Sequence, residues 1–160
     1  MTTSTTRRTI PYRRKREGKT NYKRRLALLK NRGSRLIIRR TNKHIIMQLV
    51  NYHPDGDVVA VGVSSKALEK HGWKHSGKNT SAAYLTGMLL GTKAKEAKIN
   101  DAILDLGLQT PLKGSRVYAA LKGAIDAGLN IPASEDVFPA EDRIRSEERR
   151  VGKECTLRCR

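Results

Sequence analysis

Positive charge is concentrated at one end of this 160-residue chain. Of its 33 lysines and arginines, 16 lie in the first 44 positions, where Glu17 is the only acidic residue, and the other 116 residues carry 17 bases and 14 acids. Self-repulsion at this density opposes packing of the N-terminal segment into a core unless a counter-charge is present. The chain must therefore divide into a basic arm and a nearly neutral body that supplies the hydrophobic core.

The basic arm predicts a polyanionic partner. Each phosphate that a cation neutralises releases condensed counterions, which drives binding. Tyr12 and Tyr22 lie among the arginines of this segment, and rings beside guanidinium groups can stack on unpaired bases. This pattern favours RNA with splayed nucleotides over a plain duplex. A merely solvated run of charge is the alternative, and self-repulsion of the arm argues against it.

Composition excludes several other classes of protein. No apolar run approaches the ~20 residues of a membrane span, and the first residues, Met-Thr-Thr-Ser-Thr-Thr followed by Arg7 and Arg8, have no apolar signal region. A cytoplasmic protein is expected. Cys155 and Cys159 are the only cysteines, and two ligands fall short of the four that a structural zinc site takes.

The pattern divides the chain into three segments. Residues 1–19 read as an extended basic RNA-binding arm, because they have no apolar period and are interrupted by Pro11 and Gly18. Residues 20–145 read as an α/β domain that begins with a basic helix. Residues 146–160 are highly charged with few apolar residues, which predicts a disordered tail.

The first helix is predicted over residues 20–32. Thr20 can cap its start and Gly33 can end it. Tyr22, Leu26 and Leu29 recur at helical spacing and form one apolar stripe. The helix is thus expected to dock on the body with this stripe and to face RNA with its cations.

The remaining pattern predicts a mixed sheet with helices packed on it. Strands are expected around residues 36–38, 44–52, 58–63 and 103–106, a helical turn at 66–70, and helices over 79–98 and 115–127. Apolar residues alternate on both sides of the strand at 58–63, so we expect that strand to be covered on both faces. Gly87 and Gly91 are expected to let the second helix lie close against the sheet.

The candidate catalytic motifs in the sequence each lack a required feature. Residues 72–79, Gly-Trp-Lys-His-Ser-Gly-Lys-Asn, nearly match a phosphate-binding loop, but Asn79 stands where a Mg²⁺-binding hydroxyl is needed and no strand leads into the loop. Nothing in the sequence directs Asp101, Asp105 and Asp126 to one metal site, as a metal nuclease requires. The chain is therefore expected not to be an enzyme and to need neither cofactor nor metal.

Four segments in order resemble a known family. They are Arg13-Arg-Lys-Arg-Glu-Gly-Lys-Thr-Asn-Tyr22 with Arg25-Leu-Ala-Leu-Leu-Lys30, Asn79-Thr-Ser-Ala-Ala-Tyr-Leu-Thr-Gly87, Leu104-Asp-Leu-Gly-Leu108 with Gly114-Ser-Arg-Val-Tyr-Ala-Ala-Leu-Lys-Gly-Ala-Ile-Asp-Ala-Gly128, and Val137-Phe-Pro-Ala-Glu-Asp-Arg-Ile144. Together they resemble the archaeal-type ribosomal protein L-eighteen family, whose eukaryotic relative is large-subunit protein five. The resemblance covers about residues 7–145, and the sequence after Arg145 does not resemble the family.

The resemblance implies a structural protein of the large ribosomal subunit in the cytoplasm. Such a protein binds 5S rRNA and helps attach it in the central protuberance. Large-subunit rRNA and neighbouring large-subunit proteins are further implied partners. It also implies a ribonuclease-H-like fold, that of a translational machinery component, without catalysis. A ribonuclease-H-like RNA-processing enzyme and a DNA-compacting protein are the alternatives.

The arm and the first helix are expected to carry most of the RNA contact. Their cations should bind phosphates, while Tyr12 or Tyr22 stacks on a base or packs onto the body. The predicted RNA-binding residues are Arg7, Arg8, Tyr12, Arg13, Arg14, Lys15, Arg16, Lys19, Lys23, Arg24, Arg25, Lys30, Arg32 and Arg35.

Overall fold

The computed structural model describes residues 10–110 and 112–145. The predicted tail and the first residues of the arm, with Arg7 and Arg8, lie outside the described residues. In chain order the elements are α1 (Arg13–Arg16), α2 (Tyr22–Leu29), β1 (Arg35–Arg40), β2 (Ile45–Asn51), β3 (Val58–Ser64), η1 (Ser65–His71), α3 (Thr80–Glu96), β4 (Ile103–Asp105), α4 (Arg116–Asp126), η2 (Glu135–Val137) and α5 (Glu141–Ile144).

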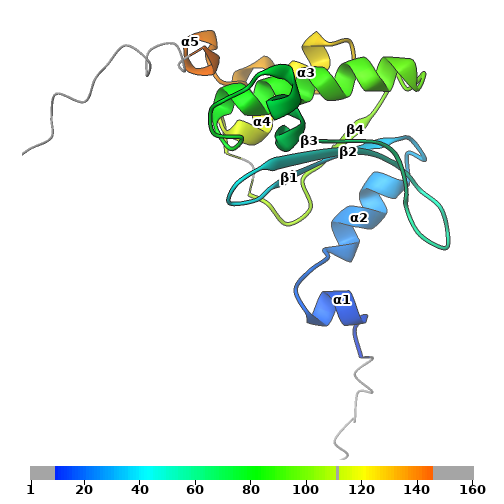
Figure 1. Cartoon of the computed structure of the whole chain (residues 1–160). Coiled ribbons are helices and arrows are strands. Elements are labelled where there is room, and N and C mark those ends of the chain that lie inside the picture. The colour runs from blue at the N-terminus through cyan, green and yellow to red at the C-terminus, as the bar shows by residue number, and fades with distance from the viewer. Residues whose placement is uncertain (1–9, 111, 146–160) are drawn as a thin grey trace, which may run out of the picture.

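Four strands form one mixed sheet in the order β3-β2-β1-β4. The first three strands are antiparallel neighbours, and β4 runs parallel to β1. Helices α3 and α4 cover one face, while α2 lies on the other side of the sheet (Figure 1). The α/β prediction with a mixed sheet is confirmed.

The core lies between the sheet and the two long helices. Alternate residues of β1 and β2 point toward α3 and α4, so that Leu36, Ile38, Met47 and Leu49 are fully buried. Leu121 of α4 is buried with them. The core is thus aliphatic, as the low aromatic content requires.

The two long helices touch through glycines. A Cβ on Gly87 would lie 2.1 Å from the carbonyl oxygen of Ala120, and one on Gly91 would lie 2.4 Å from Cβ of Ala127. A Cβ on Gly123 of α4 would meet the carbonyl oxygen of Tyr84 at 2.1 Å. The expectation that these glycines bring the helix close to the sheet was wrong, because their open side faces α4.

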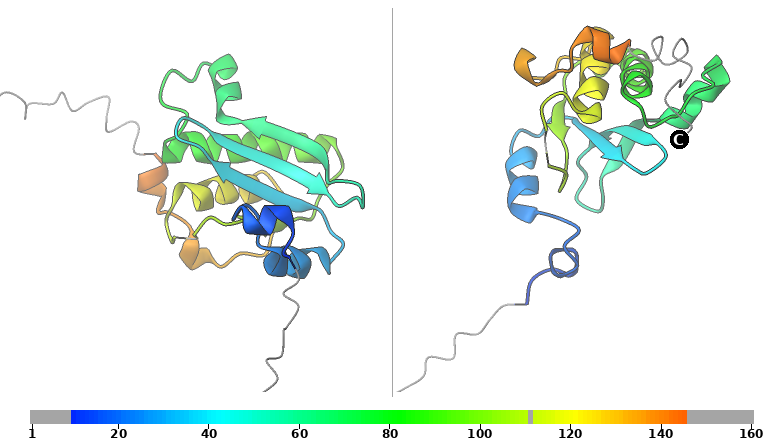
Figure 2. Two further views of the ribbon diagram at one scale, coloured as in Figure 1. Left: turned by 90° about the horizontal axis from the view of Figure 1, so that it is seen from below. Right: turned by 90° about the vertical axis from the view of Figure 1, so that its left-hand side faces the viewer.

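Strand β3 is covered on one face only. Val61 and Val63 are buried under the helices, but Val58 and Val59 are 56% and 48% exposed. The prediction of two covered faces was wrong, because β3 lies at the edge of the sheet and the helices pack on a single face. Figure 2 shows the other face from below, with α2 over only part of it.

The N-terminal segment departs from the prediction in three ways. Residues 13–16 form a helical turn, so the arm is not extended throughout. Helix α2 is capped by Asn21, whose side chain accepts from the backbone N–H of Arg24, while Thr20 Oγ1 accepts from Arg14 Nε at 2.9 Å. The helix also ends before Gly33, and Arg32 takes a positive φ of 50°.

No helix in the described part of the chain is long and apolar enough to cross a bilayer.

Candidate nucleic-acid interface

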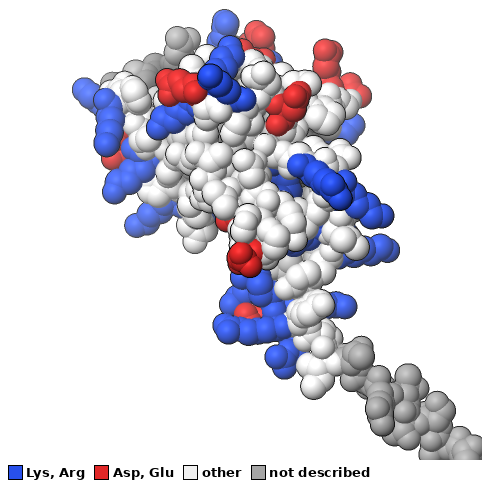
Figure 3. Space-filling model, turned by 90° about the vertical axis from the view of Figure 1, so that its right-hand side faces the viewer, with Lys and Arg blue, Asp and Glu red and all other residues white. Residues whose placement is uncertain are grey.

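The predicted cations of the arm are largely exposed. The exposed members of the set are Arg13, Arg14, Lys15, Arg16, Lys19, Lys23, Arg24, Lys30 and Arg32. Figure 3 shows Lys and Arg side chains gathered over the arm, whereas the body carries both signs of charge on that face. The structure therefore leaves the arm available to a polyanion.

Glu17 is neutralised within the arm. Arg13 Nε lies 2.8 Å from one of its carboxylate oxygens and Lys19 Nζ lies 2.9 Å from the other. Hydrogen bonds from Lys19 and then Arg13 lower the pKa of Glu17 below its ordinary value. The single acid of the arm is thus paired, and it ties the end of α1 to Lys19.

A basic groove separates the arm from the sheet. It consists of two adjoining cavities of about 550 and 560 Å³ that share Arg14, Lys19, Arg39 and Leu108 in their walls. The other lining residues are Thr20, Asn21, Tyr22, Arg24, Arg25, Gly56, Asp57, Asp105 and Gly107 in the first cavity, and Gly18, Arg40 and Gln109 in the second. Cations from α1, α2 and β1 therefore converge on one concave surface.

Both carboxylates of the basic groove are engaged by arginines. Asp57 Oδ2 lies 2.9 Å from Arg25 Nη2 and 2.7 Å from Arg35 Nη2. Asp105 Oδ2 accepts from Arg35 Nη1 at 3.2 Å. Burial tends to raise the pKa of Asp57, but Arg35 and Arg25 outweigh it and hold that pKa below the ordinary value. The excess charge of the groove is thus positive.

Arg35 is not available to RNA. Its side chain has no exposed surface and lies between Asp57 and Asp105. The contact with Asp57 is an ion pair without the alignment of a hydrogen bond, since Arg35 Nη2 has no hydrogen-bond partner. The prediction of an RNA contact at Arg35 was wrong, because a buried guanidinium cannot leave two carboxylates without a large free-energy cost.

Two further arginines are held by the loop after β4. Arg24 Nη1 donates to the carbonyl oxygen of Gly107 at 3.3 Å, and Arg39 Nη1 donates to that of Leu106 at 3.4 Å. The loop is itself held by Asp105, whose Oδ1 accepts from the backbone N–H of Gly107 at 2.8 Å. Asp105 therefore positions both the buried Arg35 and the loop that orients these two guanidinium groups.

Sequence reasoning missed the contribution of the sheet to the groove. Arg39 and Arg40 end β1, and Leu108 and Gln109 follow β4. The pairing of β1 with β4 brings these residues together. The alternation of β1 could have placed Arg39 on the same face as Arg35, opposite Leu36 and Ile38.

The apolar stripe of α2 does not dock on the body. Every residue of α2 is at least partly exposed, and Leu26 is 62% exposed. The helix is instead tied to the hairpin between β2 and β3 by Arg25 and Asp57. Tyr22 contacts Tyr12 with ring centroids 5.2 Å apart, and Tyr12 remains 73% exposed. An unpaired base could stack on the exposed face of Tyr12.

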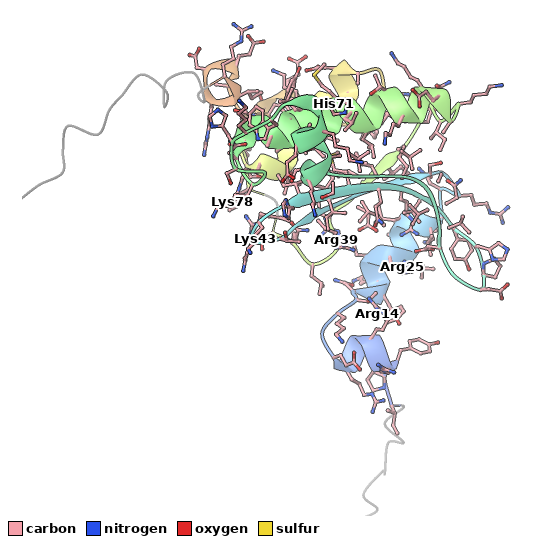
Figure 4. All side chains as sticks on the ribbon, viewed as in Figure 1. Arg14, Arg25, Arg39, Lys43, His71 and Lys78 are labelled. Atoms are coloured by element: carbon pink, nitrogen blue, oxygen red, sulfur yellow. The ribbon has the colours of Figure 1, made fainter. Side chains whose placement is uncertain are left out.

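Basic side chains continue from the groove onto the body. In Figure 4, Arg14, Arg25, Arg39, Lys43 and Lys78 follow one another from the arm toward the start of α3. Lys78 lies in the segment 58–95, whose only acidic residue is Glu69. The basic surface is therefore longer than the predicted arm.

The acids considered for catalysis each have a structural partner. Asp101 accepts from Asn130 at 2.7 Å, Asp105 binds Arg35, and Asp126 accepts from the Tyr84 hydroxyl at 2.9 Å. Burial, followed by the Asp126 hydrogen bond, raises the pKa of Tyr84. Among the described residues, no three His, Cys, Asp or Glu side chains cluster as metal ligands.

Comparison with known proteins identifies relatives over most of the chain. A family described as "Ribosomal large subunit proteins 60S L5, and 50S L18" matches residues 6–101 and 92–134. The large ribosomal subunit protein uL18 of Korarchaeum cryptofilum (strain OPF8) is 53% identical over 138 residues. That match covers 86% of this chain and 71% of the relative.

Proposed function

The chain belongs to the archaeal-type uL18 family of large-subunit ribosomal proteins, and on this basis we propose that it binds 5S rRNA and helps attach it in the central protuberance. Proteins of this family are structural components of the ribosome, so the prediction that the chain is not an enzyme is confirmed. Ribosomal RNA and other ribosomal proteins are the partners that this family implies.

The basic groove is the observation that carries the proposal. It joins Arg14 and Lys19 of the arm to Arg24 of α2 and to Arg39 and Arg40 of β1. Its two carboxylates are engaged by Arg25 and Arg35, whereas Arg14, Arg24 and Arg39 hydrogen-bond to neutral oxygens and keep their charge for a ligand. Such a concave surface fits a folded RNA, whose phosphates approach from several directions. Tyr12 supplies an exposed ring beside these cations.

We also propose that the domain has the ribonuclease-H-like arrangement. Three antiparallel strands are followed by a helix, a parallel strand and a second helix, all in one mixed sheet. That order supports the assignment. In this protein the fold would act as a scaffold that holds the groove and the basic arm, not as a catalytic centre. Asp105, which was considered as a catalytic acid, instead forms an ion pair with the buried Arg35.

The proposal is tested by binding of the full chain to 5S rRNA over a series of salt concentrations. The logarithm of affinity should fall with log salt by roughly 0.7 to 0.9 for each phosphate contact. Arg39→Ala should reduce that slope by about 1, whereas Lys93→Ala, which removes an exposed cation from α3 away from the groove, should leave the slope unchanged.

Two results would contradict the proposal. One is a flat response of affinity to salt. The other is equal affinity for 5S rRNA and for a DNA duplex of the same length, which would indicate a protein that binds any polyanion.

A further inference from the structure

Strand β3 leaves one side of the sheet unpaired. It occupies the edge position in the order β3-β2-β1-β4, where β2 is its only neighbour among the strands of residues 10–110 and 112–145 (Figure 2, left). Within the described residues, no backbone hydrogen bond other than those to β2 reaches Val58–Ser64. Alternate residues of β3 therefore direct a free N–H and C=O outward, which is a template for another strand.

The usual protections of an exposed edge are mostly missing from β3. Folded proteins block such edges with charged side chains, proline, very short strands or covering segments. Here the strand has seven residues, Val-Val-Ala-Val-Gly-Val-Ser, with neither charge nor proline. One irregularity occurs where Leu49 and Val50 of β2 pair with Val61 and Val59, and regular pairing continues from Val61 to Ser64.

We infer that β3 receives an extended strand from a neighbouring protein in the large ribosomal subunit, by addition to the sheet edge. That the partner belongs to the large ribosomal subunit rests on the proposed function. The mode of binding rests on β3 alone. Main-chain hydrogen bonds would supply affinity, and alternate side chains would supply specificity.

The chemistry of β3 argues for a protein partner rather than RNA. Cations that neutralise phosphates supply most of the affinity for nucleic acids, and the strand has no charged side chain. A second copy of the chain is disfavoured because it would bring together two N-terminal regions that each carry 16 cations and a single acid. An extended polypeptide satisfies the unpaired backbone groups without either conflict.

The surroundings of β3 specify the sequence of such a partner. Val61 and Val63 are buried on the face that α3 covers, so the partner should place apolar, β-branched residues there. Val59 and Gly62 are exposed on the other face, where polar residues fit. Lys66 and Lys70 follow β3 and are exposed, which favours an acidic residue at that end of the partner.

Hydrogen exchange of the β3 amides in three states tests the inference. The states are the free chain, the chain bound to 5S rRNA alone, and the chain within purified large subunits. Outward-facing amides of β3 should exchange at least about tenfold more slowly in the subunit than in the other two states. Unchanged exchange in the subunit would overturn the inference, and so would full protection by RNA alone or concentration-dependent protection in the free chain.

A double variant separates this inference from the proposed function. Val59→Lys with Gly62→Lys adds two charges beside the edge, at positions where side chains are exposed and a Cβ at Gly62 meets nothing closer than 3.8 Å. This variant should bind 5S rRNA no more weakly than the parent chain but should lose several-fold in competition for incorporation into subunits. Met88→Lys with Thr92→Lys adds the same two charges at exposed positions on α3; it is the charge-matched control and should compete normally.

The controls also cover a failure of folding or of RNA binding. Thermal unfolding should show that the double variant stays folded. If 5S rRNA binding failed for every variant while β3 were still protected in the subunit, the proposed function would fall and the strand addition would stand. Normal incorporation of the folded double variant would overturn the strand addition.

Discussion

Gly107 leaves room for the guanidinium group of Arg39. A Cβ at Gly107 would lie 2.1 Å from Arg39 Nη1. Gly107 also has a φ of +59°, in the left-handed region that side chains disfavour. The absence of a side chain at one position of the loop after β4 thus fixes where an arginine of β1 lies in the basic groove.

Gly107→Ala should weaken RNA binding by displacing Arg39. The flexible guanidinium can move, so the cost in folding free energy should be near the roughly 1–2 kcal/mol of the left-handed backbone alone. RNA affinity should fall several-fold in a filter-binding titration. Gly72→Ala is the matched control, because Gly72 also has a positive φ of 86° but no atom within 4 Å of its Cβ position. Equal RNA affinities for both variants would show that the position of Arg39 does not matter.

Arg35→Ala should destabilise the fold strongly. It would leave Asp57 and Asp105 without their shared buried partner, and breaking a buried ion pair typically costs about 3–5 kcal/mol. Arg25→Ala removes the more exposed partner of Asp57 and should cost less than about 1 kcal/mol. The free energies of unfolding in urea measure both. Similar values for the two variants would contradict the role assigned to Arg35.

Asp57 should make stability depend on acid pH. Its pKa in the folded protein is lowered, so its ionised form stabilises the fold at pH values above the unfolded pKa of about 3.9. That contribution is lost as the pH falls from about 4 through the folded pKa. Asp57→Asn should therefore be less stable than the parent at pH 7 and should lose less stability on going to pH 3. Parallel losses for the two proteins would exclude Asp57 as a source of acid sensitivity.

Gly87→Ala should destabilise the protein although alanine favours helices. Helix propensity alone predicts a gain of about 1 kcal/mol. The new Cβ would instead meet the backbone of Ala120 in α4, which cannot move as a side-chain tip does. We expect a net loss of about 1–3 kcal/mol from overpacking, measured by urea unfolding. Gly33→Ala, whose Cβ would meet nothing closer than 3.8 Å, is the control and should be nearly neutral.

Local patterns predicted the elements well where the deciding interactions are close in sequence. Helix α3 begins directly after Asn79, whose side chain accepts from the backbone N–H of Ala82, and Gly128 follows α4 with a φ of +107°. The strands also lie close to their predicted positions. These boundaries depend on caps and turn residues a few positions apart, which a sequence displays directly.

The errors arose where distant segments meet. Whether β3 is covered on two faces depends on where α2 lies, and whether Arg35 is exposed depends on Asp57 and Asp105. The basic groove itself was not predicted; some of the residues that line it, such as Arg14 and Lys19, were predicted to bind RNA, because the arm cations cluster locally in the sequence. The role of Arg39 and Arg40 was missed, because only the sheet places them beside the arm.

We expect the parallel pairing of β4 with β1 to form after the two hairpins while the chain is being synthesised. The first three strands form two local hairpins, whereas Arg35 pairs with Ile103 across a long stretch of chain. Local contacts form fastest, and an N-terminal region emerges from the ribosome before the segments that follow it. In a nascent chain, β1 should therefore remain an unpaired edge strand until β4 has been synthesised. Arg39 and Arg40 at the end of β1 carry charges that discourage neighbouring nascent chains from joining there. The same two arginines that line the groove in the folded protein should thus oppose intermolecular strand pairing before folding is complete.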